Sequence, residues 1–162
     1  MSALWTLVEG NAPVIVNIPQ AGTFIPDDIR GRLTPAALVV PDTDWHVDRL
    51  YAELVNGRDI TLMAATHSRI VVDLNRDPSG GALYPGASNT EICPSSTFHD
   101  EPMYHDGQAP SMEEVMARVD RYWRPYQARL AAEIHRVRQR HGYCVLLDGQ
   151  QIEWLRDAFD AT

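Results

Sequence analysis

The chain has 162 residues, of which 44% are apolar and 22% are charged, and these fractions are typical of a globular domain with a real core. Its net charge of -8 argues against nucleic acid and against anionic membrane surfaces as partners, because the long-range field would repel phosphate. Residues 1–162 are therefore expected to form a single domain, and any anionic ligand would need a local basic site.

The amino-terminal stretch and the cysteines favour a cytoplasmic protein. Residues 1–10 contain Glu9 and lack the basic segment of a secretory signal, and no apolar run approaches the length of a membrane span. Cys93 and Cys144 lie far apart and form no CxxC motif, so reduced thiols are expected in place of a zinc ribbon or a redox pair.

Strands and helices alternate along the first part of the chain. Short apolar runs bounded by turn residues predict strands, and apolar residues at helical spacing predict helices. The elements expected in order are a strand at Val14–Ile18, a short helix begun by Asp27 and Asp28, a turn at Thr34 and Pro35, a helix over residues 45–54 stopped by Gly57, and a strand over residues 60–65.

Polar residues gather where the helix over residues 45–54 begins. Asp42, Asp44, His46 and Asp48 all lie in or just before its first turns. One interpretation is helix capping and compensation of the helix dipole. The other is that Asp44 or Asp48 points into a metal or active site, and the sequence leaves both open.

The stretch 68–78 carries the most suggestive chemistry. The β-branched run 70–72 predicts a buried strand that leads directly into Asp73-Leu74-Asn75-Arg76. Polar residues at the carboxyl end of a strand are where open α/β sheets bind ligands. Arg76 offers a fork of donors to a carboxylate, Asn75 adds a directional hydrogen bond, and Asp73 can hold the arginine in place. The alternative is an Asp/Arg pair that only closes a turn.

The second half combines a long irregular segment with a long helix. Residues 79–110 show no sustained period, which is more often typical of a functional loop than of an idle connection. A capping box at Ser111 starts a helix that could run to His141 and stop at Gly142, with Pro125 kinking or splitting it. A strand over residues 143–147 and a helix over residues 150–159 complete a layered α/β fold.

Several segments together resemble the N-formylglutamate amidohydrolase family, and their order and spacing agree from about residue 13 to residue 152. They are Val16-Asn17-Ile18-Pro19-x-Ala21-Gly22, Pro41-Asp42-Thr43-Asp44-Trp45-x-Val47-Asp48-x-Leu50-Tyr51, Ser68-Arg69-x-Val71-x-Asp73-Leu74-Asn75-Arg76, Leu83-Tyr84-Pro85-Gly86, Tyr122-Trp123-x-Pro125-Tyr126 and Leu147-Asp148.

The resemblance implies a three-layer α/β/α, carboxypeptidase-like fold with a mixed central sheet. It also implies a metal-dependent hydrolysis of N-formyl-L-glutamate to formate and L-glutamate, as part of histidine degradation. The Asp-Leu-Asn-Arg segment is similar to the substrate-carboxylate motif of aspartoacylases and zinc carboxypeptidases. Asn75 and Arg76, with Arg69 as a second candidate, are therefore expected to bind substrate, and Asp73 to support them. The expected ligand is a small acidic metabolite such as glutamate or N-formylglutamate.

The departures from the family pattern concern three histidines. Where the family has imidazoles, this chain has Gln20, Gln127 and Gln150, and Gln151 stands where serine is expected. A catalytic zinc site needs about three strong ligands, and a neutral amide oxygen suits zinc poorly. With at most Asp44 remaining as a ligand, no metal is expected as the chain is written, and nothing would then lower the pKa of water.

The hydrolytic step should consequently be impaired, and two alternatives remain. One is an active enzyme whose Zn²⁺ is held by other ligands. The other is a noncatalytic interaction or regulatory module, with a homo-oligomer or a paralogue as partner. Family members also continue beyond the point that matches Thr162, so the chain is expected to be a short or truncated form.

The six histidines present give weak support for a rebuilt metal site. His67, next to Ser68 and Arg69, is the best candidate. The others are expected to be solvated, and they are His46, His99, His105, and, on a basic helix face with Arg136, Arg138 and Arg140, His135 and His141. No histidine or cysteine spacing typical of a metal motif supports them.

Overall fold

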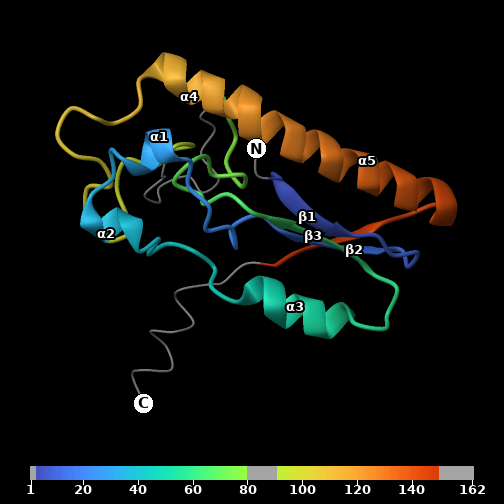
Figure 1. Ribbon diagram of the computed structural model, residues 1–162. Helices are drawn as coiled ribbons and strands as arrows, with labels where there is room; N and C mark the ends of the chain where they lie inside the picture. The colour runs from blue at the N-terminus through green and yellow to red at the C-terminus, as the bar shows by residue number, and fades with distance from the viewer. Residues whose placement is uncertain (1–2, 80–90, 150–162) are drawn as a thin grey trace.

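A mixed sheet of four strands forms the centre of the computed structural model, which describes residues 3–79 and 91–149 (Figure 1). The strands are β1 Trp5–Val8, β2 Val14–Ile18, β3 Thr61–Ala65 and β4 Val145–Asp148, in the order β1-β3-β2-β4. β2 runs parallel to β3 and β4, whereas β1 is antiparallel to β3. The mixed α/β fold and three of the predicted strands are confirmed; β1 was not predicted.

The described residues also form six helical segments. They are α1 Asp27–Arg30, α2 Pro35–Leu38, α3 Val47–Val55, α4 Met112–Arg118, the π-helical segment η1 Val119–Trp123 and α5 Arg124–His141. In Figure 1, α5 runs along one face of the sheet and α3 lies on the other, while α4 continues the line of α5 beyond the strands, above α1. Both faces of the central strands are therefore covered.

The buried residues of the central strands belong to two separate hydrophobic cores, one on each face of the sheet. On one face, Ile15 and Met63, both 0% exposed, pack with Tyr126 and Leu130 of α5. On the other, Val16 and Leu62 pack with Val55 of α3. Alternate residues of a strand point to opposite faces, so a strand covered on both faces is apolar without interruption. This explains why β2 and β3 could be predicted from apolar runs alone.

The long helix begins and ends as its sequence predicts. The Ser111 hydroxyl accepts a hydrogen bond from the backbone N–H of Glu114, and Gly142 ends α5 with φ of 79°, a left-handed conformation that glycine adopts without strain. The interruption predicted at Pro125 takes the form of a π turn, in which the N–H of Arg124 bonds to Val119 O. The wide turn ends at Trp123, two residues before the proline, which has no N–H to donate.

The prediction of a strand over residues 70–72 is wrong. These residues are buried, Ile70 1%, Val71 0% and Val72 2% exposed, but they form a turn in which Val71 N–H bonds to Ser68 O at 2.9 Å. The Ser68 hydroxyl also accepts from Ile70 N–H at 3.2 Å. A serine side chain that bonds to the local backbone competes with a strand ladder, and a three-residue apolar run cannot be assigned from its pattern alone.

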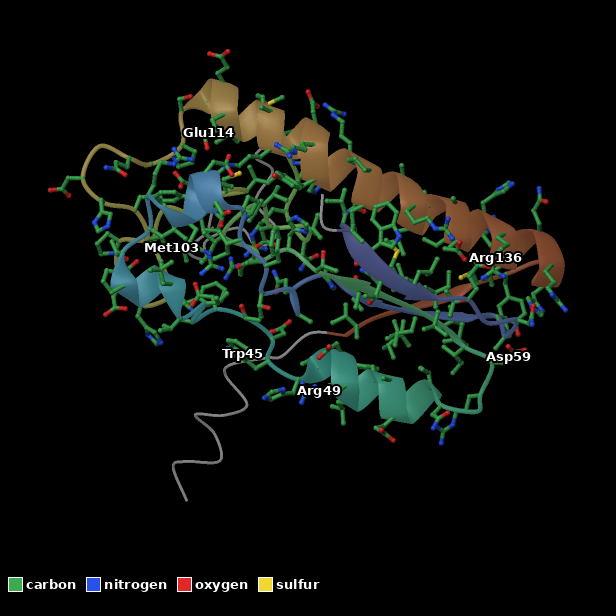
Figure 2. All side chains as sticks on the ribbon, in the orientation of Figure 1. Trp45, Arg49, Asp59, Met103, Glu114 and Arg136 are labelled. Carbon is green, nitrogen blue, oxygen red and sulfur yellow. The ribbon has the colours of Figure 1, made fainter. Side chains whose placement is uncertain are left out.

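The basic end of α5 is more than a solvated face. Arg136, labelled beneath α5 in Figure 2, donates to Gly10 O at 3.2 Å and to Thr61 Oγ1 at 2.9 Å. Arg140 bonds to the Asn11 side chain, and His141 Nε2 lies 2.6 Å from Asn11 O. These side chains therefore hold the loop between β1 and β2.

Several other predictions concern the loop, the terminus and membranes. Over residues 91–110 the backbone forms only isolated bridges and bends, as the irregular pattern predicts. The motif at residues 83–86 and the expected helix over residues 150–159 lie outside the described residues. Within residues 3–79 and 91–149, no helix is both long and apolar enough to cross a membrane.

Candidate functional site

The candidate site lies beyond the carboxyl ends of β2 and β3, which run parallel and therefore end at the same edge of the sheet. The loop after β2 and the segment after β3 touch at Gly22. A Cβ at Gly22 would lie 2.2 Å from the carbonyl oxygen of His67, so only glycine allows this approach. The contact brings Gln20 next to the segment that contains Asp73.

Asp73 is the hub of the site, and its side chain is 0% exposed. Its Oδ1 accepts from Gln20 Nε2 at 2.9 Å and from the backbone N–H of Asn75 at 3.0 Å. Its Oδ2 accepts from Arg69 Nη2 at 3.0 Å and lies 3.9 Å from Arg76 Nε. The carboxylate is thus surrounded by donors, and both Arg69 and Arg76 lie beside it.

Arg69 is buried, and its guanidinium is surrounded by two carboxylates and an aromatic ring. Its side chain is 1% exposed, and its Nη1 lies 3.6 Å from Asp42 Oδ2, on the opposite side from Asp73. The ring of Phe98 covers the guanidinium at 4.2 Å. Two carboxylates thus accompany the charge and an aromatic ring shields it from solvent, so a ligand would reach Arg69 only if Phe98 moved.

Arg76 lies at a more open position. Its side chain is 20% exposed, and its backbone carbonyl accepts from Trp123 Nε1 at 3.0 Å. Arg76 also lines a cavity of about 690 Å³ whose opposite wall comes from α4. Asn75, next to it, is partly buried. Of the predicted substrate-binding residues, Arg76 is the one that faces a cavity wide enough for a small molecule.

The acidic residues near the start of α3 differ in burial. α3 begins at Val47, after His46 with φ of 65°, and the side chain of His46 does not cap it. Asp42 and Asp44 are 9% and 7% exposed, whereas Asp48 is exposed in the first turn of the helix. Asp42 Oδ2 accepts from Phe98 N–H at 3.2 Å, and Asp44 N–H donates to Gln20 O at 3.1 Å. Asp44 therefore lies beside Gln20, as a site residue would.

The three glutamines at positions where the family resemblance implies histidines differ in their contacts. Gln20 binds Asp73, as described above. Gln127 Nε2 donates to Leu74 O at 2.8 Å and so ties α5 to the Asp-Leu-Asn-Arg segment. Gln150, with Gln151, lies outside the described residues. Both described amides thus donate to oxygen atoms of the site segment.

His67 does not join the site's carboxylates. It is 7% exposed, its ring packs against Phe24 and Tyr122 at centroid distances of 4.9 and 5.2 Å, and Nδ1 lies 2.9 Å from Thr66 Oγ1. Burial lowers the pKa of His67, which favours the neutral ring. The exposed histidines are His46, His99, His105 and His135. Across residues 3–79 and 91–149, no three His, Cys, Asp or Glu side chains gather in a way that could hold a metal ion.

A buried arginine that the sequence did not single out holds the site segment from behind. Arg118, 4% exposed, lies 3.4 Å from the carbonyl oxygens of both Ile70 and Val71, and donates to Tyr104 OH at 2.9 Å. Cys93 Sγ also donates to Val71 O at 3.4 Å, and burial raises the pKa of this thiol to about 11. The backbone oxygens of the buried turn therefore find partners on α4 and on the loop.

A second unpredicted feature is a chain of hydrogen bonds from α5 through β2 to β4, in which Tyr126 and Asn17 are buried and Asp148 is exposed. Tyr126 OH donates to Asn17 Oδ1 at 2.7 Å, and Asn17 Nδ2 donates to Asp148 Oδ1 at 2.6 Å. Burial raises the pKa of Tyr126, which keeps it a donor. All three residues belong to segments that carry the family resemblance, and a polar residue inside an apolar strand was the available signal.

Comparisons with known proteins bear on these observations. Residues 12–159 match a family model that is described as "N-formylglutamate amidohydrolase". An N-formylglutamate deformylase from Pseudomonas putida is 36% identical over 152 residues, and one from Pseudomonas aeruginosa is 34% identical. Each alignment covers 94% of this chain and 56% of the relative, so the chain spans a little over half the length of these curated relatives.

Two solved structures are also similar. The N-formylglutamate amidohydrolase from Ralstonia eutropha superposes with a TM-score of 0.71 at 32% identity, over 91% of this chain and 56% of that chain. The Atu2144 gene product from Agrobacterium tumefaciens has a TM-score of 0.65 at 20% identity, over 93% and 57%, and that likeness concerns the fold alone.

Proposed function

This chain belongs to the N-formylglutamate amidohydrolase family, and from that premise we propose that it binds a small acid such as glutamate or N-formylglutamate without hydrolysing it. The observation that carries the proposal is the hydrogen bond from Gln20 to Asp73. An amide that donates at the expected place of a zinc-binding imidazole leaves the anion-binding groups intact but removes a metal ligand.

The donor set does not suit zinc. Zn²⁺ prefers imidazole nitrogen, thiolate and carboxylate ligands, about three of them in a catalytic site. Gln20 turns its NH₂ group toward Asp73, since a carboxylate only accepts, and both Asp73 oxygens already receive donors. Asp44 lies near Gln20, but a single carboxylate is a weak site. We therefore derive no step of hydrolysis through a metal.

The anion-binding half of the site rests on Arg76. Its guanidinium is partly exposed beside a cavity, with Asp73 to orient it and with Asn75 next to it in the chain. An arginine fork binds a carboxylate through two parallel hydrogen bonds, which makes it selective for planar anions. Such a local site compensates for the overall negative charge of the chain.

The finer features of the family are part of the same proposal. Helices on both faces of the sheet support the three-layer, carboxypeptidase-like arrangement. The names of the relatives support a role connected with N-formylglutamate and thus with histidine degradation. Cys93 and Cys144 are both thiols without a disulfide, which supports a reducing compartment such as the cytoplasm.

Titration calorimetry tests the binding proposal. Glutamate and N-formylglutamate should bind to the purified chain, and Arg76→Ala should abolish the heat. Arg124→Ala is the matched control, because Arg124 is 60% exposed and bonds to Asp120 on the helix surface. Elemental analysis of the same sample should show well under one zinc per chain. Stoichiometric zinc, with formate release that a chelator stops, would instead support an active enzyme with other ligands.

A second candidate is an interaction module, and one observation favours it. β4 is an edge strand of the described sheet, and Val145, Leu146 and Leu147 are 50%, 41% and 42% exposed. An apolar edge strand is a template for pairing with a second copy or with a paralogue. Light scattering after size-exclusion chromatography would show a dimer that Leu146→Lys converts to monomers; a monomer in both cases would remove this candidate.

A further inference from the structure

The cavity beside Arg76 has a distinctive wall, which comes from α4 and the segment just before it. Met112, Val115 and Met116 line it, together with Ala109 and Pro110. Met112 and Met116 are 75% and 42% exposed, so neither thioether is used in the core. Methionine side chains are flexible and polarizable, and they adapt to apolar ligands of different shape.

Charge is unevenly distributed around the same cavity. Arg76 is the basic residue among the described lining residues, whereas Asp77 and Glu91 are acidic. The backbone N–H of Ser79 donates to Asp77 Oδ1 at 2.8 Å and lowers the pKa of that carboxyl, which favours the ionised form. A ligand carboxylate is thus attracted at Arg76, but a second anionic group elsewhere in the cavity would be repelled.

The volume of the cavity also bears on the size of the ligand. About 690 Å³ is in the range of pockets that hold drug-sized molecules, and it exceeds what a formyl group requires. Ile92 and the buried Cys93 also line the cavity, so an apolar chain would find apolar groups there besides those of α4.

From these features we propose that the preferred ligands are N-acyl amino acids with an uncharged acyl chain longer than formyl. The carboxylate of the amino acid binds at Arg76, and the acyl chain lies along the wall of Met112, Val115 and Met116. This inference rests on the proposed function, because it uses the same arginine, and it specifies the class of acid. It concerns binding only and requires no metal.

Calorimetry with a series of acyl glutamates tests the inference. N-formyl-, N-acetyl-, N-butanoyl- and N-hexanoylglutamate should bind with increasing affinity, by about two- to fourfold per added methylene buried. N-succinylglutamate has the chain length of the butanoyl compound but ends in a carboxylate. It should bind at least tenfold more weakly than N-butanoylglutamate, because of Asp77 and Glu91.

Two matched variants separate the cavity wall from general effects. Met116→Ser should remove most of the gain in affinity from N-formyl- to N-hexanoylglutamate, with each affinity expressed relative to that of glutamate for the same variant. Leu54→Ser, at a residue 48% exposed on α3, should leave the whole series unchanged. Equal affinities along the series, with Arg76-dependent binding of glutamate, would overturn this inference and leave the proposed function intact. Absence of binding by every acid, glutamate included, would overturn both.

Discussion

The side-chain amide of Gln20 and the carboxylate of Asp73, 53 residues apart in the chain, meet at 2.9 Å in the interior of the candidate site. The contribution of this hydrogen bond to the stability of the fold can be measured. Asp73 is fully buried, and an unsatisfied buried acceptor is expensive. Gln20 therefore supplies a donor to a buried carboxylate at the centre of the site.

Gln20→Ala should lower the free energy of unfolding by about 1–3 kcal/mol, because it removes a donor from a buried carboxylate. Urea denaturation followed by circular dichroism measures the change. Gln139→Ala, at an exposed position of α5, is the control and should alter stability by less than about 0.5 kcal/mol. Equal effects of the two substitutions would show that the bond to Asp73 contributes nothing particular.

The triple variant Gln20→His, Gln127→His and Gln150→His should bind zinc where the parent chain does not, since it restores the imidazoles that the family pattern contains. Elemental analysis should rise from well under one zinc per chain to near one. Formate release from N-formylglutamate by this variant would show that the ligand set alone was missing. A variant that folds and still takes up no zinc would contradict the assignment of these positions.

Phe98→Ala should open the guanidinium of Arg69 to solvent, because the ring lies 4.2 Å above it. The loss of the cation–π contact should cost about 0.5–2 kcal/mol of stability, and the affinity for glutamate should rise if Arg69 is a second carboxylate-binding residue. Phe24→Ala is a close control: Phe24 and Phe98 are both 43% exposed, but Phe24 packs on His67. Calorimetry that shows equal changes for both would remove Arg69 from the site.

Arg118→Met should be among the most destabilising single changes, by about 3–5 kcal/mol, since it removes the guanidinium from Ile70 O and the Tyr104 hydroxyl and leaves Val71 O with only the Cys93 thiol as donor. Any remaining folded protein should bind glutamate more weakly, because the turn before Asp73 is no longer held. Arg124→Met removes an exposed pair of the same chemical type and should cost less than about 1 kcal/mol. Urea denaturation of the two variants distinguishes these values.

Acid should weaken the contact between α4 and the segment near α1 through Glu114, labelled in Figure 2. A hydrogen bond from Arg32 lowers the pKa of Glu114 from 4.5 to about 2, with a further contribution from Arg118. Because the folded-state pKa is depressed, this stability is fully present above about pH 5 and is lost as the pH falls toward 2.

Glu114→Gln tests that pH dependence directly. The melting temperature of the parent chain should fall more steeply between pH 5 and pH 2 than that of the variant, and the two curves should converge at the acid end. Glu113→Gln, at the neighbouring exposed position, should leave the slope of the parent unchanged. Parallel curves for the parent and Glu114→Gln would mean that the ion pairs with Arg32 and Arg118 do not form.

Much of this arrangement could be predicted from local pattern. β2 and β3 are apolar without interruption, and the long helix has a capping serine and a terminal glycine, so neighbouring residues determine each of them. β1 is short and alternates between partly buried and exposed residues, and its assignment depends on pairing with β3, 54 to 60 residues away. The turn at residues 70–72 depends on hydrogen bonds with Ser68 and Arg118. The spacing of apolar residues in the sequence gives no sign of these bonds.

The sequence predicted those residues of the site that are charged and lie close together in the chain. Asp73 and Arg76 were found because they follow an apolar run, although that run proved to be a turn. The burial of Arg69 could not be predicted, since it depends on Phe98 from a distant irregular segment. Sequence shows which groups are present, but only tertiary contacts show which of them a ligand can reach.

The π turn at Val119–Trp123 sets the angular relation between the two ends of the long helix. Arg118 before it and Gln127 after it both bond to carbonyl oxygens of the stretch 70–74. Each residue of an α-helix advances by about 100° around the axis. Deletion of one residue within the turn would rotate α5 by roughly that angle and carry Gln127 away from Leu74, so the extra residue sets the register between helix and site.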